Sequence, residues 1–134
     1  MPEVLCAYDV ELNVTICFSR QNKKLLWAAR AAFAEVLGPA WVVEVTGGLE
    51  GTHGADSKHY QNGALDFRTG HTWEQPLMTR EQALAIRDGM QRRLGMDYDI
   101  ILEEPTPMKP RVQPHIHGEF DPKRGPVPVS KRAA

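Results

Sequence analysis

The sequence predicts a single domain of the α+β class, in which two helices pack on a small, mostly antiparallel sheet. Two segments with helical apolar spacing alternate with short runs rich in β-branched residues, and the chain contains no internal repeat. At 134 residues it is long enough to bury one core without disulfide bridges. We expect the domain to span residues 1–120 and a basic, proline-rich tail to span 121–134.

The first half of the chain predicts strands on either side of one helix. Residues 3–18 mix β-branched and apolar side chains without helical spacing, which indicates one or two strands. From about 22 to 37 the apolar residues follow a helical period instead, at Leu25, Ala29, Phe33 and Val36. Residues 40–48 read as a strand closed by glycines, 47–62 as a polar loop, and 63–69 as a core strand.

The second half begins with a helix start. Thr79 and Gln82 have the spacing of a capping box, in which each side chain satisfies a backbone N–H group. The apolar stripe that follows consists of Ala83, Ile86, Met90 and Leu94. Residues 97–103 predict a third core strand, and 115–120 a fourth. Between them, 104–114 holds four prolines and is expected to be irregular.

Composition excludes several classes of function. The net charge of −1 gives no reason to expect nucleic acid, and no apolar run approaches the ~20 residues of a membrane span. The N-terminus carries acidic residues where a secretory signal is basic, so we expect synthesis in the cytoplasm without a signal peptide. We expect a monomer, with Cys6 and Cys17 as free thiols.

A cluster of potential metal ligands follows from strand alternation. In 63–69, Asp66 shares a face with Ala64 and Arg68, and in 115–120, His117 shares a face with His115 and Glu119. If the two strands are neighbours, Asp66 and His117 converge. A turn at Asn62-Gly63 would fold His59 over the same face. Two imidazoles and one carboxylate are the ligands of an open catalytic zinc site.

The motifs resemble those of a known family. "SKHYQNGALDF" fits the pattern Ser-x-His-x-x-x-Gly-x-Ala-x-Asp, and "HIH" fits a closing His-x-His. The chain from about 45 to 120 is similar to the zinc D-Ala-D-Ala carboxypeptidase superfamily, which includes cell-wall peptidases, phage endolysins and the hedgehog signalling domain. The resemblance implies a hedgehog/DD-peptidase-like fold with the zinc site on the sheet face opposite the helices.

The resemblance also implies roles for individual residues. His59, Asp66 and His117 would bind Zn²⁺. The glutamate that ends the strand before "HIH" would be the general base, and the register leaves Glu103 and Glu104 as alternatives, with Glu103 preferred.

Two further histidines fall near the expected zinc. His53 lies where the family often has an active-site histidine, and His115 lies where some members polarise the substrate carbonyl. The carboxypeptidases of the family carry a carboxylate-binding arginine before the Ser-x-His motif. Residues 45–54, "VTGGLEGTHG", contain none, which favours an endopeptidase.

We therefore expect a zinc metallopeptidase that hydrolyses an amide bond in a peptidoglycan stem peptide, as an endo- or carboxypeptidase. It would act at the bacterial cell wall, as a phage enzyme or a virion-associated protein. The alternative is a zinc-binding module without turnover that recognises the cell wall or another protein, because fold and ligands alone do not establish catalysis.

Three other polar residues have simpler expectations. Arg68 is expected in a structural ion pair and His71 in solvent. Glu119 either orients a ligand imidazole or pairs with an arginine.

Overall fold

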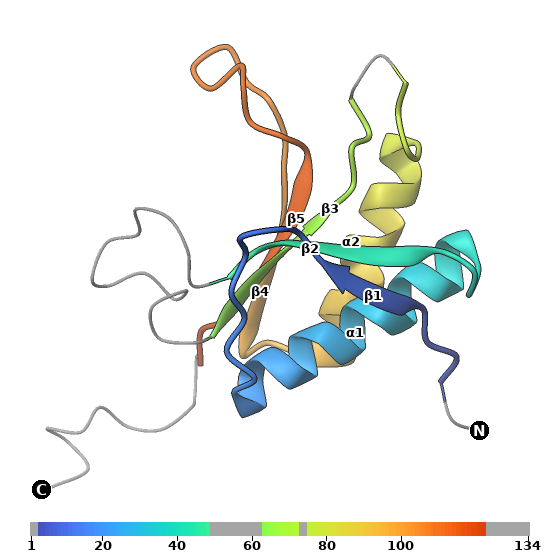
Figure 1. Ribbon diagram of the computed structural model, residues 1–134, viewed down its shortest axis with the longest axis vertical. Coiled ribbons are helices and arrows are strands. Elements are labelled where there is room, and N and C mark those ends of the chain that lie inside the picture. Colours follow the sequence, from blue (N-terminus) through green and yellow to red (C-terminus); the bar gives the residue numbers. More distant parts are fainter. Residues whose placement is uncertain (1–2, 49–62, 73–74, 123–134) are drawn as a thin grey trace, which may run out of the picture.

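The computed structural model describes residues 3–48, 63–72 and 75–122, which form two helices and five strands (Figure 1). In chain order these elements are β1 (Ala7–Val10), α1 (Arg20–Leu37), β2 (Val42–Gly47), β3 (Ala64–Arg68), α2 (Arg80–Leu94), β4 (Tyr98–Glu103) and β5 (His115–Phe120). The predicted α+β class is confirmed. The predicted tail at 121–134 lies outside the described residues except for 121 and 122.

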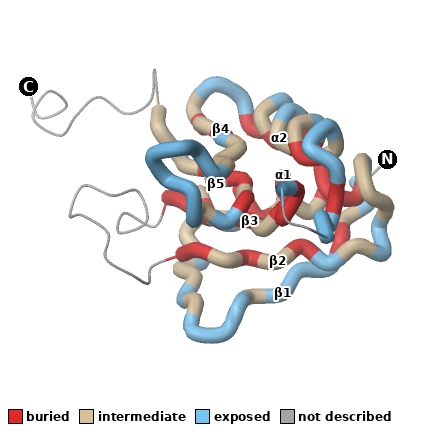
Figure 2. The backbone as a smooth tube through the Cα atoms, turned by 90° about the horizontal axis from the view of Figure 1, so that it is seen from above, coloured by how far each residue is buried: buried red, intermediate tan, exposed pale blue. Residues whose placement is uncertain are grey.

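The five strands form one mixed sheet in the order β1-β2-β3-β5-β4. β1 pairs with β2 in parallel, and the other three pairs are antiparallel, as predicted for most of the sheet. The two helices pack against each other on one side of the sheet (Figures 1 and 2). β5, the last strand in sequence, lies between β3 and β4, and this insertion brings the HIH motif beside Asp66.

Both helices begin and end at residues that satisfy free backbone groups. Ser19 Oγ accepts a hydrogen bond from the Asn22 N–H at the start of α1. The predicted capping box of α2 is confirmed, because the Gln82 N–H donates to Thr79 Oγ1 while the Thr79 N–H donates to Gln82 Oε1. Gly38 and Gly95 follow the two helices with φ of 96° and 80°, a region that favours glycine.

Alternate residues of the strands give the sheet one apolar and one polar face. The side chains toward the helices are almost fully buried and include Leu65, Phe67, Ile100 and Ile116, which pack with Leu25 and Phe33 of α1. Gly118 allows this close approach, since a Cβ there would lie 2.8 Å from Leu25 Cδ2. The opposite face carries the polar residues that the alternation predicted.

The N-terminal segment, predicted to hold one or two strands, forms one. Of residues 3–18, only Ala7–Val10 form a strand. Cys6 bonds to α1 instead of the sheet, because its N–H donates to the Arg30 carbonyl and its carbonyl accepts from Arg30 Nε. After β1 the chain turns through Asn13, whose φ is 71°, and residues 14–19 form no regular element. Cys6 and Cys17 are free thiols, as expected.

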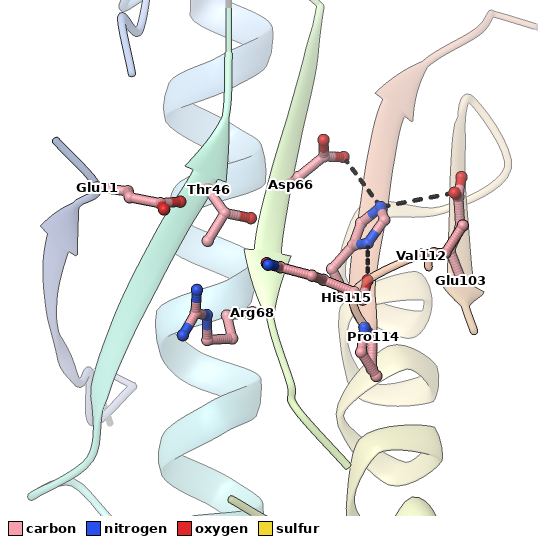
Figure 3. A pocket seen from close by; sticks show the side chains of 9 residues that line it. Glu11, Thr46, Asp66, Arg68, Glu103, Val112, Pro114 and His115 are labelled. Atoms are coloured by element: carbon pink, nitrogen blue, oxygen red, sulfur yellow. Dashed lines mark hydrogen bonds and ion pairs between the residues drawn. The ribbon is translucent and has the colours of Figure 1, made fainter. Parts of the chain in front are cut away.

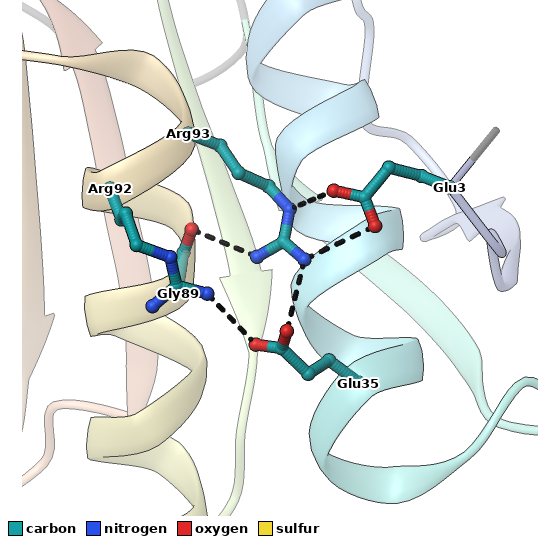
Figure 4. A network of polar contacts seen from close by, with 5 residues as sticks. All are labelled: Glu3, Glu35, Gly89, Arg92 and Arg93. Atoms are coloured by element: carbon teal, nitrogen blue, oxygen red, sulfur yellow. Dashed lines mark hydrogen bonds and ion pairs between the residues drawn. The ribbon is translucent and has the colours of Figure 1, made fainter. Parts of the chain in front are cut away.

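Arg93 of α2 connects three parts of the fold (Figure 4). Its guanidinium donates to Glu3 near the N-terminus at 2.7 Å, to Glu35 of α1 at 3.3 Å and to the Gly89 carbonyl at 3.0 Å. The hydrogen bonds from Arg93 lower the pKa of both Glu3 and Glu35. Arg92 adds a second contact to Glu35. This network holds the N-terminal segment and the two helices together.

The outer edge of β4 is covered by side chains of α2. Gln91 Nε2 donates to the Tyr98 carbonyl at 2.6 Å, Gln91 Oε1 accepts from the Ile100 N–H at 3.2 Å, and Arg87 Nε donates to the Ile100 carbonyl at 2.8 Å. Backbone groups that would otherwise be open to another strand are thereby satisfied.

Neither described helix is long and apolar enough to cross a lipid bilayer.

Candidate metal and catalytic site

Sheet register brings the predicted ligands together. β3 and β5 pair with Asp66 opposite His117 and Arg68 opposite His115. β4 and β5 pair with Glu103 opposite His115. These side chains all project from the polar face, because they alternate with the buried residues of the same strands. The predicted convergence of Asp66 and His117 is confirmed.

The His117 imidazole lies between two carboxylates. Its Nδ1 is 2.7 Å from Asp66 Oδ1, and its Nε2 is 2.9 Å from Glu119 Oε1. Burial opposes a positive charge on this ring, but the hydrogen bonds and charges of Asp66 and Glu119 outweigh it and raise the pKa of His117 to about 9. A metal cation and a proton therefore compete for the same imidazole. Glu119 contacts this ring, which was one of its two predicted roles.

His115 and Glu103 face each other beside this pair (Figure 3). The His115 Nδ1–H donates to the Gln113 carbonyl at 2.6 Å, which leaves Nε2 directed into the cleft. Nε2 lies 3.6 Å from Glu103 Oε2 and 3.8 Å from Asp66 Oδ1. Both separations exceed a direct hydrogen bond.

Asp66, Glu103 and His115 border a cavity of about 320 Å³ on the polar face. Thr46 of β2 and Glu11, which follows β1, line its opposite side (Figure 3). Arg68 also lines it and lies 3.2 Å from Glu44 Oε1, so the predicted ion pair of Arg68 is confirmed. The size is near the lower end of small-ligand pockets, which is enough for the part of a peptide around one amide bond.

The absence of a side chain at Gly47 makes room for the Asp66 carboxylate. Gly47 lies opposite Asp66 where the β2–β3 register shifts, and a Cβ on residue 47 would collide with the Asp66 carboxylate. The glycine that ends β2 is therefore required by the orientation of the predicted ligand. We expected this glycine only as the end of a strand.

Glu104, the alternative base, is engaged elsewhere. Arg80 Nε and Nη2 each donate to its carboxylate at 2.9 Å, and His71 Nε2 is 2.8 Å from Glu104 Oε2. The bonds from Arg80 outweigh burial and, with His71, lower the pKa of Glu104 to about 2. Glu103, in contrast, lines the cavity beside His115.

The prediction that His71 lies in solvent is wrong. It is 6% exposed, and its Nδ1 is 2.8 Å from Thr69 Oγ1 while its Nε2 meets Glu104. The polar residues around it in the sequence suggested a solvated linker. Contacts with Glu104, which is distant in sequence, bury it instead. The spacing Thr69-x-His71 carries no signal that could have predicted this contact.

The ligand set agrees in part with a zinc site. Asp66 and His117 supply a carboxylate oxygen and an imidazole nitrogen, donors that zinc binds readily, and their contacting atoms are adjacent. The predicted third ligand, His59, and the predicted active-site residue His53 lie outside the described residues. Glu119 provides the hydrogen-bonded partner that ligand imidazoles usually have.

A second group of carboxylates lies next to this site. Ligand atoms of Asp99, Glu119 and Asp121 are within 4.8 Å of one another, so they could hold a metal ion. Sequence reasoning missed this group, because Asp99 and Glu119 become neighbours only through the β4–β5 register. Alternation within each strand gives the faces, but it does not give that register.

No protein-family model, curated protein or solved structure matches the chain. The resemblance to the zinc D-Ala-D-Ala carboxypeptidase superfamily therefore remains an inference from the motifs.

Proposed function

We propose that this protein is a zinc-dependent peptidase that hydrolyses an amide bond in a peptidoglycan stem peptide. The observation that carries the proposal is the convergence of Asp66 and His117 with Glu103 and His115 on one polar face of the sheet. Two groups suited to hold a metal thus lie beside two groups suited to acid–base work. The choice of peptidoglycan rests on the motif resemblance.

Each residue has a role in this proposal. Asp66 and His117, with His59, would hold the zinc. When bound, zinc would lower the pKa of a water to about 7, so that it can act as the nucleophile, and would polarise the scissile carbonyl. Glu103 accepts the proton of the attacking water and passes it to the leaving amine.

His115 stabilises the oxygen on which charge develops. Because Gln113 accepts the Nδ1–H bond, Nε2 faces the cleft and donates to that oxygen when the ring is protonated. Its separation of 3.6 Å from Glu103 places both groups within reach of the same reacting amide.

The proposal is tested by peptide release from purified peptidoglycan by the zinc-loaded protein. Glu103→Gln should lower the rate by about 10²–10⁴-fold, as expected for loss of a general base, and should still bind zinc. Glu104→Gln is the matched variant. It should retain measurable cleavage, because the Glu104 carboxylate binds Arg80 and His71.

One outcome would contradict the proposed peptidase, and a second would contradict only the assignment of its base. If the wild type binds one zinc and releases no peptide, the site serves recognition, as in the alternative of a zinc-binding module. If Glu104→Gln abolishes release while Glu103→Gln does not, peptide hydrolysis stands but the base is wrongly assigned.

A further inference from the structure

A second, larger cavity adjoins the candidate site. Its volume is about 680 Å³, and it is lined by the irregular segment between β4 and β5 together with Thr72. Val112 and Gln113 line both cavities, so the two adjoin along this segment. The two cavities therefore share part of their lining.

The two cavities differ in charge. Three carboxylates line the first, on Glu11, Asp66 and Glu103, and its cation Arg68 is paired with Glu44. In the second, the one described carboxylate is that of Glu104, which is already bound by Arg80 and His71.

Arg111 is the cation of the second cavity. It lines the cavity and, within the described part of the chain, forms no ion pair. The second cavity therefore presents a guanidinium that is available to an anionic group, and guanidinium matches a carboxylate with two parallel hydrogen bonds.

The segment that carries Arg111 is fixed at both ends. Glu104 at its start is held by His71 and Arg80. Pro114 at its end accepts hydrogen bonds from the N–H groups of Thr69 and Gly70, both at 3.2 Å.

The same segment is also bonded internally. Thr106 and Lys109 exchange backbone hydrogen bonds of 3.1 and 3.0 Å, which form a tight turn. A guanidinium on this backbone needs less ordering on binding than one on a free loop.

We propose that the second cavity binds an anionic part of the substrate, a peptide carboxylate next to the scissile amide, with Arg111 as its cationic partner. The inference rests on the proposed function for the choice of a peptide. It goes beyond that function by assigning a specificity-determining residue and the charge of the substrate that it selects.

Binding by the zinc-loaded Glu103→Gln variant tests this assignment without cleavage. The probes are a synthetic stem pentapeptide with free carboxylates and the same peptide with each carboxylate converted to an amide. Adding Arg111→Gln to this variant should weaken binding of the peptide with free carboxylates (the acid peptide) by about tenfold. Binding of the amidated peptide (the amide peptide) should stay unchanged. Lys109→Gln, which removes a charge from the same segment outside the cavity, is the matched control.

The outcomes separate this inference from the proposed function. The parent Glu103→Gln variant should bind the acid peptide more tightly than the amide peptide, and adding Arg111→Gln should make the two affinities equal. Both results together support the inference. If the parent binds both forms equally, or Lys109→Gln has the same effect as Arg111→Gln, the inference is overturned. If the wild type cleaves nothing while the Arg111-dependent preference holds, the inference stands and the peptidase proposal fails.

Discussion

The imidazole of His117 and the carboxylate of Asp66 lie directly opposite each other on β5 and β3, with Nδ1 and Oδ1 2.7 Å apart. Their contact depends on the register of the sheet, which runs from Ala64 opposite Glu119 to Arg68 opposite His115. A shift of one residue in β5 would turn His117 toward the helices. The candidate site is therefore built on the central strands of the fold.

Removal of either member of this pair should abolish tight zinc binding. Asp66→Ala and His117→Ala each delete a proposed ligand, whereas Glu119→Gln keeps both ligands and changes only the group that contacts the His117 ring. We expect the first two variants to copurify without zinc and Glu119→Gln to bind it about 10–100-fold more weakly. Metal analysis and calorimetric titration measure both effects.

Circular dichroism of these variants separates ligand loss from unfolding. A folded His117→Ala protein that still binds one zinc with wild-type affinity would contradict the assignment of His117. The zinc would then have to lie elsewhere, and the carboxylates of Asp99, Glu119 and Asp121 would be the next group to vary.

Gly47→Ala should impair the metal site more than the fold. The added Cβ collides with the Asp66 carboxylate, which must move from its position beside His117. We expect zinc affinity to fall by about 10–100-fold, the range seen when the support of a ligand is lost. Titration with zinc, on a variant shown to be folded, measures the effect. Unchanged affinity would show that Asp66 does not bind the metal in this position.

Gly118→Ala should have the opposite effect. A Cβ at this position meets Leu25 Cδ2 at 2.8 Å and Ile100 Cδ1 at 3.2 Å, on the apolar side of β5. Overpacking of this kind lowers the free energy of unfolding by about 1–3 kcal/mol. Urea unfolding of the metal-free proteins avoids the stabilisation that bound zinc would add. A zinc affinity that falls as much as in Gly47→Ala would contradict the division of the sheet into two faces.

Periodicity was sufficient to predict most elements of this fold. The capping box at Thr79, the helical repeats and the strands at 97–103 and 115–120 depend on neighbours in the sequence, and the structure has each of them within a few residues. Alternation placed Asp66 and His117 on polar faces. Their contact also required β3 and β5 to be neighbours, a condition that alternation leaves open and that the structure meets.

The error at His71 has a physical cause. His71 is buried by Glu104 and Thr69, and Glu104 lies 33 residues further along the chain. A contact between distant segments decides its position, and no local pattern reports such a contact. Of the two candidate bases, only Glu103 lines the first cavity, and its role as the base stays a prediction.

The ion pair of Glu104 should make part of the stability depend on pH. Arg80 is the main cause that lowers the Glu104 pKa from an ordinary 4.5 to about 2 in the folded protein. A carboxyl whose folded pKa is lowered stabilises the protein above its unfolded value and loses that contribution as the pH falls toward the folded value. Because the pair is partly exposed, Glu104→Gln should lower the free energy of unfolding by only about 1 kcal/mol at pH 7, and by much less near pH 2.

Urea unfolding of the wild type and Glu104→Gln at pH 7 and at acidic pH measures this difference. Glu81→Gln, on the same helix as Arg80, controls for the loss of one negative charge. A cost for Glu104→Gln that stays constant from pH 7 to pH 2 would show that the contact with His71, and not the charge, stabilises this segment.

Gln91 should protect the edge of the sheet as well as stabilise it. Its amide donates to the carbonyl of Tyr98 and accepts from the N–H of Ile100, so Gln91→Leu leaves backbone groups of β4 without these partners. We expect a loss of about 1–3 kcal/mol in unfolding free energy and new, concentration-dependent association through the open edge. Urea unfolding measures the first effect, and light scattering across a range of protein concentrations measures the second. Arg92→Leu is the control, because Arg92 points to Glu35 and not to β4. Equal association of the two variants would indicate that an added surface leucine, rather than the uncovered strand, is responsible.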